Sequence, residues 1–124
     1  MIFVVDTNVL FSACLTPAGR IFEILFNTPA HVQLMSSKYA IEELQFHKQK
    51  LIRVSRYSEP EMDSVLNAVL KQIDFLDESI ISLQYWEEAN RLTIGVDSKD
   101  ISFVALALQT GGWLCTAIKN SVII

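Results

Sequence analysis

The chain has 124 residues, of which 51% are hydrophobic and 19% charged, with only four Gly and three Pro. This composition excludes a disordered or low-complexity chain, because its apolar side chains can offset the entropy lost on folding. Ten Lys and Arg against fourteen Asp and Glu give a net charge of −4, so binding of nucleic acid through a basic surface alone is not expected. The length predicts a single domain over residues 1–124.

The two cysteines and the N-terminus indicate the compartment. Cys14 and Cys115 each lie in apolar sequence without a CxxC pair, so we expect two core thiols in a reducing, cytoplasmic environment. The first apolar run follows no basic segment and ends at Asp6, which is not the pattern of a signal peptide. No apolar run approaches the roughly 18 residues of a membrane span, and no membrane association is expected.

The predicted elements alternate between strands and helices. Short apolar runs predict strands at residues 2–5, 31–35, 80–83, 113–116 and 121–124. Helices are expected from about residue 7 or 8, over 17–27, as one helix from 36 or 37 through 51, over 60–74 with its start at 58, over 85–92 and over 99–109. This alternation predicts an α/β protein with three layers, α/β/α, around a mostly parallel sheet of four to five strands.

Acidic residues are placed where such sheets bind ligands, beyond the carboxyl ends of the strands. Asp6 directly follows the first strand and is equally suited to capping the next helix or to a functional role. Glu43 lies in the helix after the second strand, where a solvated carboxylate is the ordinary interpretation. Asp97 and Asp100 precede the last helix, where acids also stabilise a helix start.

The combined pattern is more specific than its parts. Asp6-Thr7-Asn8-Val9-Leu10, Glu43-Leu44 and Asp97-x-x-Asp100-x-x-Phe103-Val104-Ala105-Leu106-Ala107 resemble the motifs of PIN domains, and the resemblance extends from residue 2 to about residue 120. It implies a PIN-like fold and a Mg²⁺- or Mn²⁺-dependent ribonuclease, often the VapC-type toxin of a toxin–antitoxin pair. It also implies an RNA substrate, an antitoxin protein as partner and a homodimer.

The resemblance also assigns roles to individual residues. The carboxylates that would bind the metal and carry catalysis are Asp6, Glu43 and Asp100. Asp97 would be an auxiliary ligand or would lie directly behind the ligands. Hydrogen bonds that support the site would come from Asn8 and Thr116. Carboxylates suit this chemistry because Mg²⁺ is a hard cation that prefers oxygen ligands.

One position departs from the family pattern of Thr-x-Asp after the last core strand. Thr116 matches, but Ile118 stands where the fourth acid is usual. The absence of this fourth carboxylate weakens the second metal position most. Three outcomes remain open: a one-metal site with slow cleavage, replacement of the missing ligand by Asp97 or Asn120, or a catalytically inactive PIN-like module that binds a protein partner or RNA.

Two other protein classes, an aspartyl-phosphate phosphatase and a phosphorylatable receiver domain, match this sequence poorly. An aspartyl-phosphate phosphatase would carry an acid at the position of Asn8, and a receiver domain would carry an acid pair after the first strand. A basic segment contains Lys48, Lys50, Arg53 and Arg56. It is expected to be either a solvated helix face or an edge that binds phosphates. The Phe and Trp side chains are expected in the core or in an interface rather than in base stacking.

Overall fold

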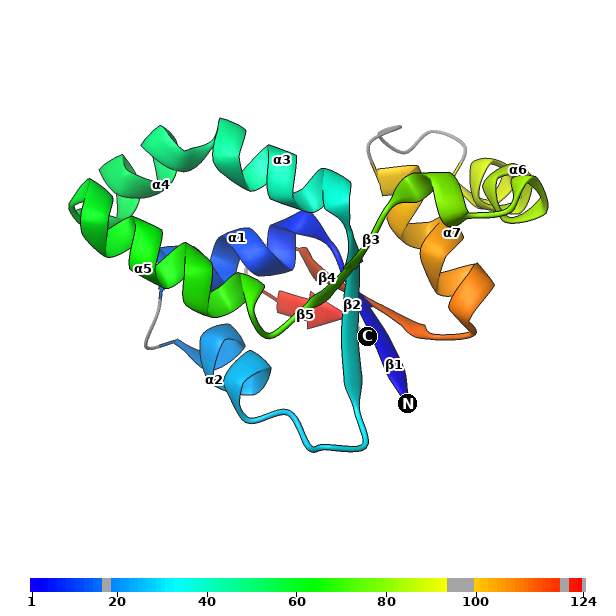
Figure 1. The fold of residues 1–124 in the computed structure, drawn as a ribbon, viewed down its shortest axis with the longest axis horizontal. Helices are drawn as coiled ribbons and strands as arrows, with labels where there is room; N and C mark the ends of the chain where they lie inside the picture. Colours follow the sequence, from blue (N-terminus) through cyan, green and yellow to red (C-terminus); the bar gives the residue numbers. More distant parts are fainter. Residues whose placement is uncertain (17–18, 94–99, 119–120, 124) are drawn as a thin grey trace.

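The computed structural model describes residues 1–16, 19–93, 100–118 and 121–123. Beyond residue 115 it describes the backbone only. Strands and helices alternate along the chain (Figure 1). The strands are β1 (Ile2–Val5), β2 (Gln33–Ser37), β3 (Asp74–Leu76), β4 (Trp113–Ile118) and β5 (Ser121–Ile123). The helices are α1 (Thr7–Leu15), α2 (Arg20–Phe26), α3 (Lys38–Phe46), α4 (Lys48–Ser55), α5 (Glu59–Leu70), α6 (Leu83–Leu92) and α7 (Ile101–Thr110), with a 3₁₀ turn, η1 (Glu78–Ile80).

The strands form one sheet in the order β3-β2-β1-β4-β5. The first four are parallel, and β5 pairs antiparallel with β4. Helices α6 and α7 lie on one side of the sheet and α1 to α5 on the other (Figure 1). The predicted α/β fold, with three layers around a mostly parallel sheet, is confirmed.

The centre of the sheet is the most apolar part of the molecule. Strand β1 has a neighbour on each side, and its Val4 and Val5 are almost completely buried. β-Branched side chains on a strand covered on both faces explain why the short run at residues 2–5 was recognisable from sequence. The expected burial of Cys14 and Cys115 is also confirmed, and both thiols are free.

The prediction of a strand over residues 80–83 is wrong. The edge strand is β3, which pairs with β2 through Met35–Asp74 and Ser36–Phe75. After it, the Asp77 carboxylate accepts a hydrogen bond from the Ser79 amide and starts the 3₁₀ turn. The apolar run was misleading because only Ile81 within it is buried.

The helix predicted from residue 36 or 37 through 51 is two helices. Helix α3 ends at Phe46, and α4 begins at Lys48, with His47 between them outside helical geometry. Leu44 and Leu51 are both fully buried, so their spacing alone gave no sign of a break. The bend directs α4 onto α1 and α5, where Leu51 reaches the core.

The other boundaries differ less from the prediction. Helix α5 starts at the predicted Ser58, which forms a capping box with Glu61, and stops at Leu70 rather than 74. The second strand is two residues later than predicted, and residues 17–18 of the predicted helix 17–27 lie outside the described part. Among the described residues, no single helix combines the length and apolarity of a membrane span, although α1 and α2 together, as a sharply bent pair, pass that test.

Candidate active site at the carboxyl edge of the sheet

Asp6 lies at the carboxyl end of the central strand. Its side chain is 5% exposed, and Oδ1 accepts a hydrogen bond from the Val9 amide at 3.0 Å, which caps α1. Its own amide donates to the Cys115 carbonyl of β4 at 3.2 Å. The capping role considered from sequence is therefore real. It also fixes the carboxylate between the ends of two strands, which is compatible with a functional role.

Glu43 is brought to the same place by one hydrogen bond. The Thr7 hydroxyl donates to Glu43 Oε1 at 3.0 Å, across 36 positions of sequence. Thr7 is buried and Glu43 is half-buried, so Glu43 is not the solvated helix carboxylate that the ordinary interpretation suggested. Because Thr7 directly follows Asp6, two of the three predicted acids are each hydrogen-bonded to the first turn of α1.

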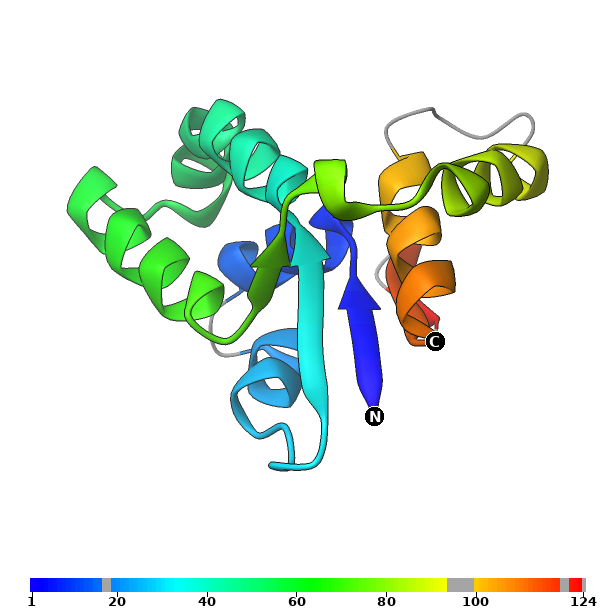
Figure 2. The same cartoon turned by 45° about the vertical axis from the view of Figure 1, so that its right-hand side comes forward.

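Asp100 reaches this edge through the direction of α7. A Cβ at Gly112, just beyond the helix, would lie 2.8 Å from the Ile2 carbonyl oxygen, so α7 ends beside the beginning of β1. Ten helical residues span about 15 Å, close to the length of a four-residue strand. The half-buried Asp100 precedes the first residue of α7, and α7 begins on the side of the sheet where β1 ends, as the orange helix in Figure 2 shows.

Serine hydroxyls line the same edge, and sequence reasoning missed them. Ser36 donates to the Val5 carbonyl at 2.7 Å. Ser37 and Ser102 are buried, and their hydroxyls have no hydrogen-bond partner within the described residues. A buried hydroxyl without a partner is costly, so these two positions suit contact with a ligand or water. The available signal was Ser36-Ser37 at the end of a strand, as Asp6 is.

The side chains at this edge carry oxygen atoms, which are the ligands that hard divalent cations prefer. Mg²⁺ is commonly held by one or two carboxylates together with water and substrate phosphate, and Asp6, Glu43 and Asp100 offer only oxygen. Ser37 and Ser102, whose hydroxyls have no hydrogen-bond partner among the described residues, add oxygen atoms. No three His, Cys, Asp or Glu side chains of the described part, which includes Asp6, Glu43 and Asp100, are grouped closely enough to hold a metal ion, so the three acids are not assembled into a metal site in this structure.

The remaining predicted residues are only partly placed. Asn8 is exposed in the first turn of α1. Thr116 and Ile118 lie in β4, where Ile118 pairs with Ser121 of β5, but their side chains are outside the described part. Asp97 and Asn120 are also outside the described residues.

The thiols near this site are not nucleophiles at neutral pH. Burial, and then the negative charge of Asp6, raise the pKa of the Cys115 thiol to about 11. Burial raises the pKa of Cys14 to about 12. Since the thiolate is the reactive form, the carboxylates are the chemical groups of this edge.

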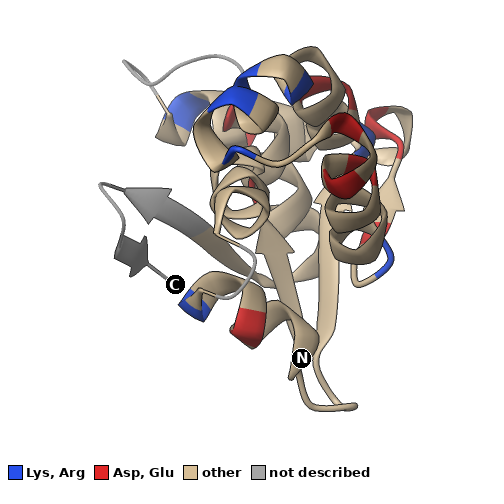
Figure 3. Cartoon of the chain, turned by 90° about the vertical axis from the view of Figure 1, so that its left-hand side faces the viewer, with Lys and Arg blue, Asp and Glu red and all other residues tan. Residues whose placement is uncertain are grey.

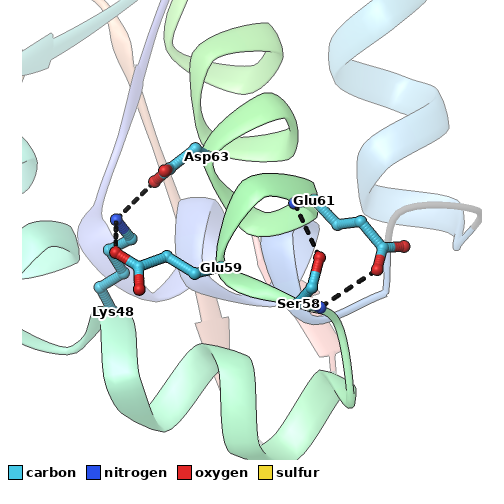
Figure 4. A network of polar contacts seen from close by, with 5 residues as sticks. All are labelled: Lys48, Ser58, Glu59, Glu61 and Asp63. Carbon is cyan, nitrogen blue, oxygen red and sulfur yellow. Dashed lines mark hydrogen bonds and ion pairs between the residues drawn. The ribbon is translucent and has the colours of Figure 1, made fainter.

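The basic segment is divided between two roles. Lys48 forms ion pairs with Glu59 and Asp63 of α5, beside the capping box of Ser58 (Figure 4). Figure 3 shows basic and acidic stretches of the chain next to one another on this side of the molecule. Lys50 instead lies over the Phe11 ring, with its Nζ 5.7 Å from the ring centroid.

Comparisons with known proteins agree with this fold. Residues 4–119 match the family model of the PIN domain, whereas a comparison with curated proteins found no match. A chain in the crystal structure of VapBC2 from Rickettsia felis, bound to a DNA fragment from their promoter, is similar with a TM-score of 0.68, 17% identity and coverage of 92% of this chain and 86% of that one. Mycobacterium tuberculosis VapC20, a sarcin–ricin loop cleaving toxin, is similar with a TM-score of 0.50, 16% identity and coverage of 89% and 84%. Because the family model covers most of its length, this chain belongs to the PIN-domain family.

Proposed function

We propose that this protein is a ribonuclease that uses Mg²⁺ or Mn²⁺ to hydrolyse phosphodiester bonds of RNA. The observation that supports the proposal is the Thr7–Glu43 hydrogen bond, which ties Glu43 to the residue directly after Asp6, at the carboxyl end of the central strand of a PIN domain. Asp100 begins a helix at the same edge. Fold-level similarity to VapC20, a toxin that cleaves the sarcin–ricin loop, supports the same class of activity.

In this proposal Asp6, Glu43 and Asp100 hold the cation, with Asp97 as an auxiliary group and Asn8 and Thr116 as supporting residues. When bound, a divalent cation would activate water and stabilise the negative charge that develops on the phosphate. It would also balance the repulsion between neighbouring carboxylates. Bound cations further account for how a protein with a net charge of −4 accepts a polyanion.

Two hydrogen bonds prepare the carboxylates before any ligand arrives. The Val9 amide fixes one oxygen of Asp6, and the Thr7 hydroxyl fixes one oxygen of Glu43. Both donors belong to the first turn of α1, so one helix start orients both acids. Such positioning lowers the cost of ordering the site when RNA binds.

We further propose that the protein is the toxin of a toxin–antitoxin pair, that it acts in the cytoplasm and that it forms a homodimer. The similar fold found in the VapBC2 structure supports an antitoxin as partner. Exposed Ile24 on α2 offers apolar surface for an interface. A monomeric mass by light scattering at micromolar concentration would contradict the dimer.

Ile118 sets the level of activity that we propose. The family usually has an acid at this position, and an isoleucine cannot bind a cation, so cleavage slower than in an enzyme with four carboxylates is expected. We expect Ile118→Asp to raise the rate. The alternative, an inactive PIN-like module, is favoured by this one position.

The deciding experiment measures RNA cleavage and Mn²⁺ binding for the wild type and for Asp6→Asn. Asparagine also caps helices well, so the variant should keep its fold while losing about 100-fold or more of the metal-dependent cleavage rate. Asp63→Asn, an exposed acid of α5, is the matched control and should cleave normally. Wild-type protein that leaves RNA intact with Mg²⁺ or Mn²⁺, and that binds no Mn²⁺ by calorimetry, would establish the inactive module instead.

A further inference from the structure

Phe46 is an exception among the phenylalanines of this protein. The other six are buried or half-buried, whereas Phe46 is 84% exposed at the end of α3. Exposure of a whole aromatic ring gains nothing for folding, because the ring's apolar surface stays in water. The expectation that the Phe side chains lie in the core or in an interface therefore leaves this position unexplained.

Phe46 lies about one helical turn after Glu43. The two residues are three positions apart on α3 and share a face of the helix, and Glu43 is hydrogen-bonded to Thr7 of α1. One turn further along both helices, His47 contacts Phe11 edge to face, with ring centroids 6.3 Å apart. Phe46 in turn contacts His47 edge to face at 5.0 Å. A continuous row of rings thus leads from the Thr7–Glu43 contact to the open ring of Phe46.

Positive charge accompanies this row of rings. Lys50 is exposed and lies over the Phe11 ring, and Arg53, one turn later on α4, is also exposed. Neither forms an ion pair with any residue that the structure describes, in contrast to Lys48. An exposed ring at the end of α3 is thus followed on α4 by two exposed cations that form no ion pair within the described residues. On a protein with a net charge of −4, a ring and two cations match the base and the phosphates of a nucleotide.

We propose that an unpaired RNA base stacks on Phe46, while Lys50 and Arg53 contact the phosphates on either side of it. The inference rests on the proposed ribonuclease function and adds a binding subsite beside its carboxylates. Base stacking on an aromatic side chain requires one open ring and accepts any base, and cations add backbone affinity. A stable protein interface needs a much larger patch, about 800 Å² on each partner, so RNA fits a single exposed ring flanked by cations better.

The test measures binding of a short single-stranded RNA that contains 2-aminopurine, using the Asp6→Asn protein so that the RNA stays intact. Phe46→Ala should weaken binding roughly 5- to 150-fold, the range that base–aromatic stacking provides, and should remove the quenching of 2-aminopurine fluorescence. Phe46→Trp should preserve both. Leu83→Ala, at a 70% exposed apolar position of α6, is the matched control and should bind normally.

An abasic RNA separates stacking from a structural effect. With the bases removed, Phe46→Ala and its parent should bind equally, because only the phosphate contacts remain. If the wild type cleaves RNA but Phe46→Ala binds intact RNA as tightly as its parent, base stacking on Phe46 is overturned. The ribonuclease proposal would be unaffected by that result. Loss of self-association on the Phe46→Ala change, without loss of RNA affinity, would assign the ring to a protein interface and also overturn base stacking. If the wild type neither binds nor cleaves RNA, the ribonuclease proposal fails first.

Discussion

Two polar regions of this protein are built in opposite ways. On the surface between α4 and α5, Lys48 pairs with two acids, and Ser58 and Glu61 satisfy each other in a capping box (Figure 4). At the carboxyl edge of the sheet, acids are buried or half-buried and two buried hydroxyls have no partner among the described residues. The polar groups of the surface region satisfy one another, whereas the sheet edge keeps polar groups whose partners are not among the described residues.

Among the variants that compare these two regions, the largest effect is expected from loss of the hydrogen bond between Thr7 and Glu43. Thr7→Val removes the hydroxyl that orients Glu43 but keeps the shape of the side chain. We expect a loss of about 10- to 100-fold in RNA cleavage, the usual effect of removing a group that orients a metal ligand, with little change in melting temperature. Kinetics at saturating Mn²⁺ measure it. A rate equal to that of the wild type would show that Glu43 needs no orientation.

The thiols should make the buried region sensitive to alkaline pH. Their pKa values of about 11 and 12 lie above the ordinary 9.0, so the folded state retains protons that the unfolded chain releases. This stability is complete below pH 9 and is lost as pH rises towards 11–12, by more than about 1 kcal/mol. Urea titrations should show that the free energy of unfolding falls less between pH 9 and 11 in the double variant Cys14→Ala/Cys115→Ala than in the wild type. Parallel curves would contradict burial of the thiols.

The capping box tests the surface region. Ser58→Ala leaves the Glu61 amide without its side-chain acceptor and should lower the free energy of unfolding by about 1 kcal/mol. Thermal or urea unfolding measures this, and RNA cleavage should not change. Ser64→Ala, an exposed serine within α5, is the control and should have no destabilising effect. A cleavage defect in Ser58→Ala would connect two regions that we treat as separate.

Ser37 offers the sharpest contrast between the regions. Its hydroxyl is buried and unpartnered within the described residues, so Ser37→Ala should leave the free energy of unfolding unchanged or raise it by up to about 1 kcal/mol. If the hydroxyl contacts a ligand or an ordered water, cleavage should decrease in the same variant. A stability gain without any loss of activity would show that Ser37 has no functional role.

The smallest effect is expected at the ion pairs of Lys48. Lys48→Met keeps the apolar stem and removes the charge, so the free energy of unfolding should fall only slightly, because exposed ion pairs contribute little. The difference should shrink further in 1 M salt, where screening is strong. Unfolding curves at two salt concentrations test this. A loss that does not depend on salt would indicate packing rather than charge.

Much of the architecture was accessible from local patterns. The β-branched run of β1, Ser58 with Glu61 three positions later, and the apolar residues of α7 each have a local physical cause. The errors arose where neighbours decide: residues 80–83 look like a strand but have no strand to pair with, and the break at His47 follows from the place where α4 packs. The PIN-domain motifs were recognisable because they combine residue types with order along the chain.

For the candidate site, the sequence determined which acids follow the strands and therefore which edge of a parallel sheet would carry them. It also determined the chemical kind of the site, since carboxylates at such an edge suit hard cations. Only the tertiary structure decided that Thr7 orients Glu43, that Ser37 and Ser102 are buried without partners among the described residues, and that the Phe46 ring is open to solvent. Local preferences set the strands and helix starts, whereas these contacts join residues distant in sequence and depend on how α1, α3, α4 and α7 pack on the sheet.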